Sequence, residues 1–320
     1  MKLDELRRLA RIIGKPGSPA DQEKLQEQLW AMGVDPGNLY QELEMTSRYV
    51  DTHQDISYPG AVMHLHSHIF YEILCCRSTS GVEYLVGAQR YRLQRGDIVL
   101  VPPGVSHRPL LPENMAEPYR RDVLWLSLEF AERLQSMFPE VIRTEDKQVY
   151  LLRTANTRWE QLMDLFHRGV VESEQREQGW EAALIGNTVL VLTLMRRALQ
   201  DKHAMGPDAE TPELLDRVLA YVEKHLGEKL SLTEVAKHFF VSEATITQTF
   251  RRKMGTSFYR CVTQRRLIAA KLLIEQGGLM EHVGQQVGFS DYSTFYRAFK
   301  QEFGISPRQY RKRQENGSAD

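Results

Sequence analysis

The chain of 320 residues has few cysteines and no long hydrophobic run. Its three cysteines are Cys75, Cys76 and Cys261; the first two are neighbours that cannot easily bridge each other, so we expect reduced thiols. The longest apolar stretch, residues 184–195, falls short of the roughly 20 residues that cross a bilayer. No secretory signal is recognisable at the N-terminus. These absences predict a cytoplasmic protein with no membrane span.

Net charge is also nearly absent, at -1, but the two signs are unevenly distributed. Residues 211–320 carry 17 Lys and Arg against 12 Asp and Glu, whereas the rest of the chain carries 24 against 30. A basic C-terminal third is typical of a module that binds phosphates of nucleic acid, and it also occurs on ordinary solvated helical surfaces. The 42% of hydrophobic residues and the modest counts of 21 Gly and 13 Pro exclude disordered and collagen-like chains.

Hydrophobic patterning divides the chain into five parts. Residues 1–50 predict a helical extension, and residues 51–132 contain short strand-like runs, which are typical of a sandwich or barrel. The predicted strands are residues 61–68, 71–76, 82–86, 89–93, 97–101 and 123–130. Helices are predicted at 157–172 and 180–200 within a packing or dimerisation region, 133–203; the second is so apolar that it must close the β domain or contact another subunit. Residues 204–212 form a polar linker with Gly and Pro, and residues 213–315 are helical.

The helical C-terminal part contains an internal repeat. Residues 235–242 align with residues 283–290 at an offset of 48, and Ile246, Phe250 and Gly255 align with Phe295, Phe299 and Gly304 at an offset of 49. Each copy predicts a short helix, a turn, a capping Ser and an amphipathic helix that ends at Gly. This is a helix-turn-helix unit, present twice, with residues 258–276 as a connecting helix.

The second helix of each copy presents a polar face opposite its apolar stripe. The outward residues are Ala244, Thr247, Gln248 and Arg251 in the first copy and Ser293, Tyr296, Arg297 and Lys300 in the second. A Gln side chain can bond adenine and an Arg side chain guanine, whereas Arg251 and Lys300 suit phosphates. We therefore predict these eight residues as the DNA-binding set; the alternative is a solvated face.

Residues 211–315 resemble the DNA-binding domain of the AraC/XylS family of bacterial transcription regulators. The matching residues are Ala236, Ser242, Phe250, Lys253, Gly255, Arg266, Ala270, Leu273, Ile274, Val287, Gly288, Phe289, Ser290, Asp291, Phe295, Phe299, Lys300, Gly304, Pro307, Tyr310 and Arg311. The resemblance implies binding to double-stranded promoter DNA, a homodimer and a contact with RNA polymerase. One departure is Gly284, where the family usually has Ala; a helical Gly costs about 0.5–1 kcal/mol, which predicts a looser second unit.

A second group of polar residues lies in the β segment. Gly60-x5-His66-x-His68-x3-Glu72 is followed by Gly96-x5-Pro102-x-Gly104-x2-His107. His66 and His68 would share one face of a strand, and with Glu72 and His107 they would form a donor set that suits a divalent transition metal. Both segments resemble the two motifs of the cupin barrel, although Leu111 replaces the Asn that often ends the second motif.

Two interpretations of this group follow. The favoured one is an effector pocket, because AraC-type regulators often carry a cupin-like N-terminal domain without established catalysis. Its predicted binding residues are His64, His66, His68, Glu72, Tyr84 and His107, with Tyr71 as a further candidate. This interpretation predicts no enzymatic activity, no cofactor and no metal. The alternative is a metal-dependent cupin enzyme or metal sensor, with His66, His68, Glu72 and His107 as ligands.

The predicted protein is thus a multidomain α and β chain. A cupin-like β-barrel with flanking helices precedes an all-α domain of two helix-turn-helix units joined by a long helix. The predicted function is that of a sequence-specific DNA-binding transcription regulator, whose barrel senses a small-molecule effector and modulates promoter binding.

Overall fold

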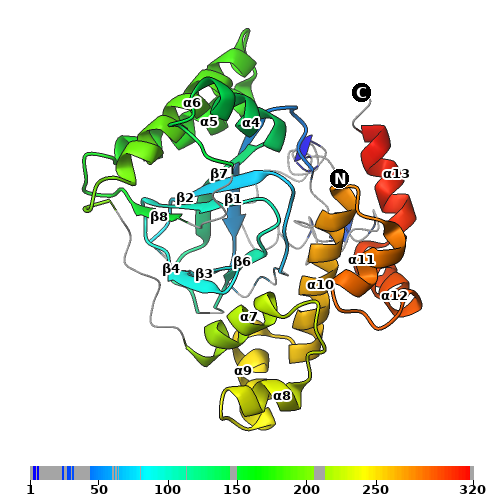
Figure 1. Ribbon diagram of the computed structural model, residues 1–320. Helices are drawn as coiled ribbons and strands as arrows, with labels where there is room; N and C mark the ends of the chain where they lie inside the picture. Colours follow the sequence, from blue (N-terminus) through cyan, green and yellow to red (C-terminus); the bar gives the residue numbers. More distant parts are fainter. Residues whose placement is uncertain are drawn as a thin grey trace. The chain divides into compact units, whose positions relative to one another are not determined.

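The computed structural model describes residues 3–4, 6, 24, 27–29, 31, 44–59, 61, 63, 65–79, 81–112, 114–144, 150–204 and 213–317. The chain divides into two compact units: residues 1–86 with 91–210, and residues 211–320 with 87–90. In Figure 1 the first unit runs from blue to green and the second from yellow to red. The predicted helices of residues 1–50 and the linker after Ala204 lie largely outside the described residues.

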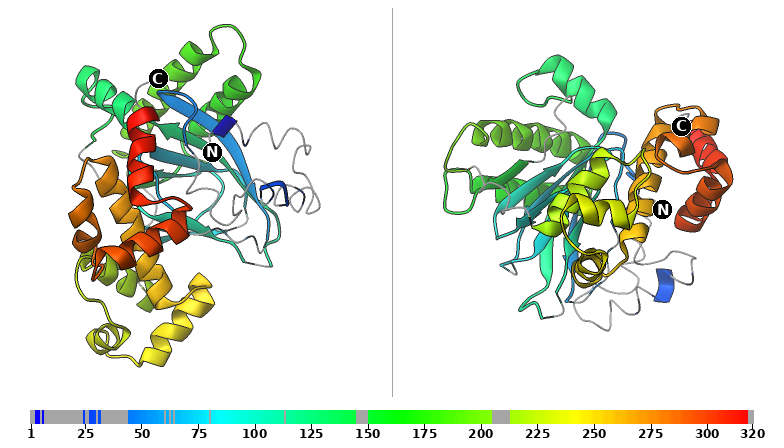
Figure 2. Two further views of the ribbon diagram at one scale, coloured as in Figure 1. Left: turned by 90° about the vertical axis from the view of Figure 1, so that its right-hand side faces the viewer. Right: turned by 60° about the horizontal axis from the view of Figure 1, so that its bottom comes forward.

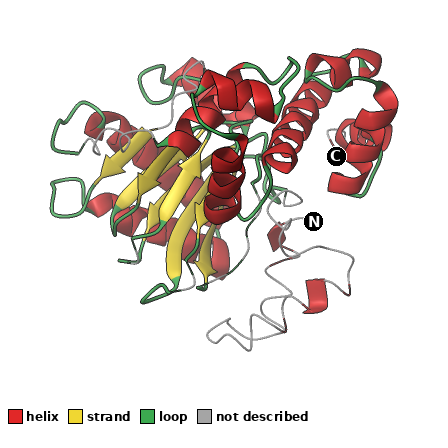
Figure 3. Ribbon diagram, turned by 90° about the horizontal axis from the view of Figure 1, so that it is seen from below, coloured by secondary structure: helices red, strands yellow, loops and turns green. Residues whose placement is uncertain are grey.

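The first unit contains two antiparallel sheets. Its strands are β1 (Val50–Ser57), β2 (Tyr71–Cys76), β3 (Glu83–Val86), β4 (Gln89–Arg92), β5 (Asp97–Val101), β6 (His107–Leu110), β7 (Tyr119–Leu126) and β8 (Tyr150–Arg153). The order in the larger sheet is β1-β7-β2-β5-β8, and the smaller sheet has the order β4-β3-β6. The strands (yellow) lie side by side in Figure 3. The predicted cupin-like β-rich unit is confirmed.

Strand alternation separates two hydrophobic cores. Leu74, Cys76 and Trp125 of the larger sheet pack with Tyr84 of the smaller one, which fills the space between the sheets. The intervening Cys75 belongs to the other core, on the helix-covered face. Burial raises the pKa of the Cys76 thiol to about 11 and that of Cys75 further. Both cysteines therefore act as small buried hydrophobic residues rather than reactive thiolates.

Three helices flank the larger sheet: α4 (Leu128–Met137), α5 (Gln161–Gln175) and α6 (Trp180–Ala198). Helix α5 packs on β1 and β7, and α6 packs on α5. Figure 2 shows this pair (green) from two further sides. Helix α5 approaches β1 closely at Gly169, whose carbonyl accepts a 2.7 Å hydrogen bond from Thr52. Leu184, Val191 and Met195 of α6 belong to the hydrophobic core on the helix-covered face of the larger sheet. Helix α6 therefore closes the β domain, which is one of the two alternatives predicted.

Several predicted strands differ from the structure. Residues 61–68 do not form a strand where they are described, except for a single bridge between His66 and His107. The last predicted strand ends at Leu126, because Ser127 caps α4 by accepting from the Phe130 amide. Strand β8 lies within the region predicted to be helical, and β1 and β6 lie outside every predicted strand. The polar sequence of β1 hides its alternation, since several of its polar side chains are buried.

Residues 213–317 of the second unit form helices joined by short turns. Its elements are α7 (Leu214–Lys224), α8 (Leu232–His238), α9 (Glu243–Met254), α10 (Phe258–Glu275), α11 (Met280–Gln286), α12 (Tyr292–Phe303) and α13 (Pro307–Gly317). Ser242 caps α9 as predicted, whereas Asp291 rather than Ser290 caps α12. Gly255 and Gly304 end these helices with left-handed φ values of 60° and 72°. No described helix of the protein is long and apolar enough to cross a membrane.

Gly284 shows how the repeat accommodates different side chains. A Cβ at this position would lie 2.8 Å from the Phe295 ring, closer than packed atoms approach. The equivalent residues in the first copy are Ala236, which is larger than Gly284, and Ile246, which is smaller than Phe295; both are buried. Gly284 therefore makes room for the buried Phe295, which gives it a role in packing.

We predict that Gly284→Ala lowers the free energy of unfolding by about 1–3 kcal/mol through overpacking, although Ala is the better helix former. Urea unfolding of the variant and of Gly284→Ala/Phe295→Ile, which recreates the first copy's pair, tests this. The second substitution should recover part of the loss. A more stable single variant would contradict the packing argument.

Candidate functional site

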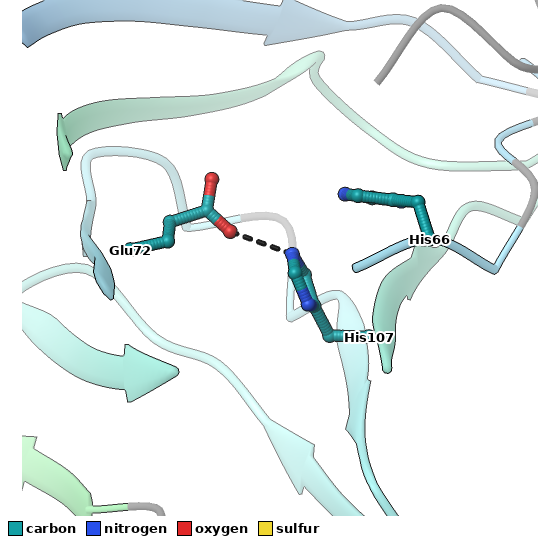
Figure 4. Close-up of side chains that lie close together, drawn as sticks. All are labelled: His66, Glu72 and His107. Carbon is teal, nitrogen blue, oxygen red and sulfur yellow. Dashed lines mark ion pairs between the residues drawn. The ribbon is translucent and has the colours of Figure 1, made fainter. Parts of the chain in front are cut away.

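Three of the predicted pocket residues meet between the two sheets. Figure 4 shows Glu72 on β2, His107 on β6 and His66 on the segment between β1 and β2. His107 Nε2 lies 2.7 Å from Glu72 Oε2, and the rings of His66 and His107 are 4.3 Å apart. One ligand atom from each of the three residues lies within 4.8 Å of the others. All three side chains are buried.

Contacts within the site hold Glu72 in its charged form. His107 Nδ1 lies 2.9 Å from the Val105 carbonyl, and since a carbonyl can only accept, Nδ1 carries a proton. Its Nε2 faces Glu72 Oε2. Burial acts to raise the pKa of Glu72, but His107 and His68 outweigh it and hold that pKa well below its usual range. Glu72 is therefore a buried carboxylate that lies against the His107 ring.

His68 completes the predicted set with a different role. Its Nδ1 donates to the Phe70 carbonyl at 2.8 Å, and its ring stacks on Phe70 at 4.0 Å. Burial lowers the pKa of His68, so the ring is neutral and Nε2 carries a lone pair. This atom lies 3.5 Å from Glu72 Oε2 and has no hydrogen-bond partner among the described residues. His68 thus offers a buried acceptor to a ligand.

The remaining predicted pocket residues have different positions. Tyr84 is buried on β3, 6.3 Å from the His107 ring. Tyr71 instead belongs to the core on the helix-covered face, and its hydroxyl bonds the Thr144 carbonyl, so its assignment to the pocket was wrong. A strand residue one position before Glu72 points to the opposite face of the sheet. His64 lies outside the described residues.

The interior also contains polar residues that sequence reasoning missed. Arg121 Nη2 lies 2.9 Å from Asp55 Oδ2, and its Nη1 donates to Ser57 at 3.0 Å. His53 lies 3.6 Å from Asp55 and edge-on to Trp125, whose indole donates to Glu72 at 3.2 Å. These contacts join the two carboxylates in one buried chain. No alternation in the sequence marked these residues, since residues 51–55 are all polar.

The predicted DNA-binding residues lie on the outer faces of α9 and α12. Ile246, Phe250, Phe295 and Phe299 are buried. The predicted residues are exposed, except for the half-buried Thr247: Ala244, Thr247, Gln248, Arg251, Ser293, Tyr296, Arg297 and Lys300. The structure shows no ion pair for Arg251, Arg297 or Lys300 among the described residues. Their charges are therefore available to a partner.

A polar-lined barrel and two helix-turn-helix units define the class of ligand-responsive DNA-binding regulators. Residues 52–222 match the model of the AraC-like ligand binding domain, and residues 235–313 match that of a helix-turn-helix domain. The first match covers more than half of the 320 residues, and the chain belongs to the AraC-like family. It is an effector-sensing, DNA-binding transcription regulator.

The chain is similar to the following known proteins. The chain is 24% identical over 251 residues to the HTH-type transcriptional activator RhaS of Escherichia fergusonii, covering 77% of this chain and 87% of that protein. It is 26% identical over 267 residues to RhaS of Salmonella dublin, covering 79% and 89%. A solved regulator with an AraC-type DNA-binding domain from Chromobacterium violaceum is 25% identical, with a TM-score of 0.30, over 32% of this chain and 91% of that one.

The ion pair between Asp55 and Arg121 should make the stability of the fold depend on pH. Burial acts to raise the pKa of Asp55, but Arg121 and His53 lower it to about 2, below the ordinary value of 3.8. A lowered pKa stabilises the fold above pH 4, and this contribution is lost as the pH falls toward 2.

We predict that Asp55→Asn is less stable than the wild type at pH 5 by about 2 kcal/mol or more, since it leaves Arg121 buried without its carboxylate. The difference should narrow by about 1 kcal/mol at pH 3. Urea unfolding at both pH values measures it. A difference that does not change with pH would show that the ion pair does not act as described.

Proposed function

We propose that the barrel interior binds the effector through His66, His68, Glu72, Tyr84 and His107, with His64 as a further candidate, and that α9 and α12 read the promoter. The observation that supports the effector site is a buried polar interior with atoms that the protein itself does not satisfy. His68 Nε2 and the Tyr119 hydroxyl have no hydrogen-bond partner among the described residues. Because an unpaired buried polar group costs about 1–3 kcal/mol, a ligand that bonds these atoms would stabilise the barrel.

Ligand binding would act on DNA affinity by a population shift. An effector that binds one conformation of the barrel more tightly favours that conformation, and the same preference changes the fraction of protein competent to bind DNA.

Thermal-shift titration with sugars and organic acids tests the pocket. One class of ligand should raise the melting temperature of the wild type and of the surface control Arg168→Ala, but not that of Glu72→Gln. Equal shifts in Glu72→Gln and Arg168→Ala would refute this site.

A metal site is the second candidate function, because the donor atoms of His66, Glu72 and His107 converge within 4.8 Å. The donor types fit Fe(II), Mn(II), Ni(II) or Zn(II), and such an ion would supply Lewis-acid chemistry when bound. The relatives carry the name of transcriptional activators, which favours a regulator over an enzyme.

We predict that the untagged protein contains less than one transition metal per chain, because the Glu72–His107 ion pair competes with a metal for both ligands. Elemental analysis after chelation measures this. Stoichiometric Fe, Mn, Ni or Zn that is lost in His66→Ala but kept in a surface variant such as Arg168→Ala would establish the metal-dependent alternative.

Promoter recognition is proposed to combine base contacts with phosphate contacts. Gln248 and Arg297 carry amide and guanidinium groups that suit base edges, whereas Arg251 and Lys300 suit the backbone. In α12 the aromatic residues Phe295 and Phe299 are buried and the predicted DNA-binding residues are exposed, so the folded helix can present those residues to DNA.

We predict that Arg297→Ala weakens binding to the preferred duplex by about 1–3 kcal/mol and relaxes the preference at one base pair. Lys300→Ala, the matched control, should weaken all duplexes alike. Selection of bound duplexes from a random library, followed by mobility-shift titration, measures both effects. An unchanged base preference in Arg297→Ala would refute its assignment.

A homodimer is proposed through the exposed face of α6. Ala183, Gly186, Leu190, Thr193 and Arg197 follow a coiled-coil spacing along this face, and Leu190 is 45% exposed. A Cβ at Gly186 would meet nothing within 4 Å, so a second helix can approach closely. In an antiparallel pair the exposed Glu181 at the start of one helix would lie near Arg197 at the end of the other.

We predict that Leu190→Glu makes the protein monomeric, because two carboxylates would meet at the centre of this pair. Sedimentation equilibrium distinguishes the states, with Arg168→Glu on α5 as a control for added charge. A dimer that survives Leu190→Glu would place the subunit contact elsewhere.

We also propose that the protein acts in the cytoplasm and contacts RNA polymerase.

A further inference from the structure

A surface hollow lies between the end of α4 and the C-terminal half of α6. Its volume is about 300 Å³, at the lower limit of the roughly 300–1,000 Å³ that is usual for ligand pockets. The residues that line it are Phe138, Glu140, Val141, Val189, Thr193, Arg196, Arg197 and Gln200. None of these residues belongs to the set proposed to bind the effector, so the hollow is a separate place in the first unit.

Part of the lining is apolar. Val141 belongs to the hydrophobic core that the buried residues of α6 also join, which holds the segment after α4 against that helix. The backbone amide of Val141 bonds the Phe138 carbonyl at 2.9 Å, so the chain turns here. The Phe138 side chain stays 43% exposed, and the neighbouring lining residue Val189 is half-buried. Apolar surface that remains open to water favours a ligand that covers it.

The rest of the lining carries positive charge. Arg196 and Arg197 lie in the last turn of α6, and neither forms an ion pair among the residues that the structure describes. Cations are common in the last turn of a helix, so their place alone marks no site. Arg196, however, is half-buried and lines the hollow. Because its guanidinium group has lost part of its hydration, a carboxylate that it bonds in two places is a favourable partner.

The other polar groups limit the charge of a ligand. Glu140 lines the same hollow, so the two guanidinium groups and this carboxylate leave one positive charge. One carboxylate neutralises that charge, whereas a dianion exceeds it. The Thr193 hydroxyl donates to the Val189 carbonyl at 2.8 Å, which leaves its oxygen only as an acceptor. The lining therefore suits a ligand with one negative charge at one end and an apolar body.

We propose that this hollow is a second ligand site, which binds a small amphipathic monocarboxylate. The carboxylate pairs with Arg196 and Arg197, and the apolar body covers Phe138 and Val189. A sugar has no charge for the two arginines, and inorganic phosphate has no apolar body. The site goes beyond the function proposed above. Thr193 and Arg197 also lie on the α6 face proposed for the homodimer, so Arg196, which lies off that face, is the residue that tests the site.

Calorimetric titration of the full-length protein with 4-phenylbutyrate measures the binding. The neutral 4-phenylbutan-1-ol and acetate, which lacks the apolar body, serve as comparison ligands. The wild type should bind one 4-phenylbutyrate per chain and bind both comparison ligands about tenfold or more weakly. Arg196→Gln should lose about tenfold or more in affinity for 4-phenylbutyrate, and Phe138→Ala should also bind more weakly. Arg168→Gln, which removes an exposed arginine from α5, should bind as the wild type does.

Photolabelling locates the bound ligand directly. The photoreactive monocarboxylate 4-benzoylbenzoate should label residues 138–141 or 189–200, and excess 4-phenylbutyrate should prevent the labelling. A label in the strands of the barrel would overturn the proposal, as would equal binding of the alcohol, full affinity in Arg196→Gln or no binding by the wild type. Binding that appears only in Leu190→Glu would assign the hollow to a subunit contact and would also overturn it.

Discussion

The ion pair between Glu72 and His107 joins the two sheets of the first unit, because Glu72 lies on β2 of the larger sheet and His107 on β6 of the smaller one. Burying both charges costs free energy, and the cost is offset only while the pair and its hydrogen bonds stay intact. Trp125 and the Val105 carbonyl supply those bonds. The spacing of the sheets, and with it the shape of the interior, therefore depends on this contact.

A polar interior of this kind would be a poor choice for stability alone. Asp55 and Arg121 at one position and Glu72 and His107 at another occupy space that apolar side chains could fill. The same groups are suited to recognition, since hydrogen-bonding atoms in a dry interior discriminate strongly between ligands. In the second unit, α9 and α12 likewise keep their polar residues for contacts with a partner: each helix buries an aromatic and aliphatic stripe and leaves its polar residues exposed.

Sequence reasoning predicted the parts in which pattern and packing agree. The repeat predicted both helix-turn-helix units and the connecting helix, and His66, His68, Glu72 and His107 converge as their spacing implied. It failed where tertiary contacts override local pattern. Buried Asp51 and His53 made β1 hard to recognise among polar residues, and His66 and His68 reach the site although the described residues of 61–68 form no strand. Gly284 read as a weakness because its partner Phe295 lies in another helix.

The two recognition helices of one chain, α9 and α12, are proposed to bind the same duplex. Hydroxyl-radical footprinting of the wild type on a selected duplex tests this most directly. We expect two protected segments on one face of the DNA, separated by about one helical turn of 10–10.5 base pairs for each bound chain. A single protected segment per chain, or uniform protection without sequence preference, would contradict it.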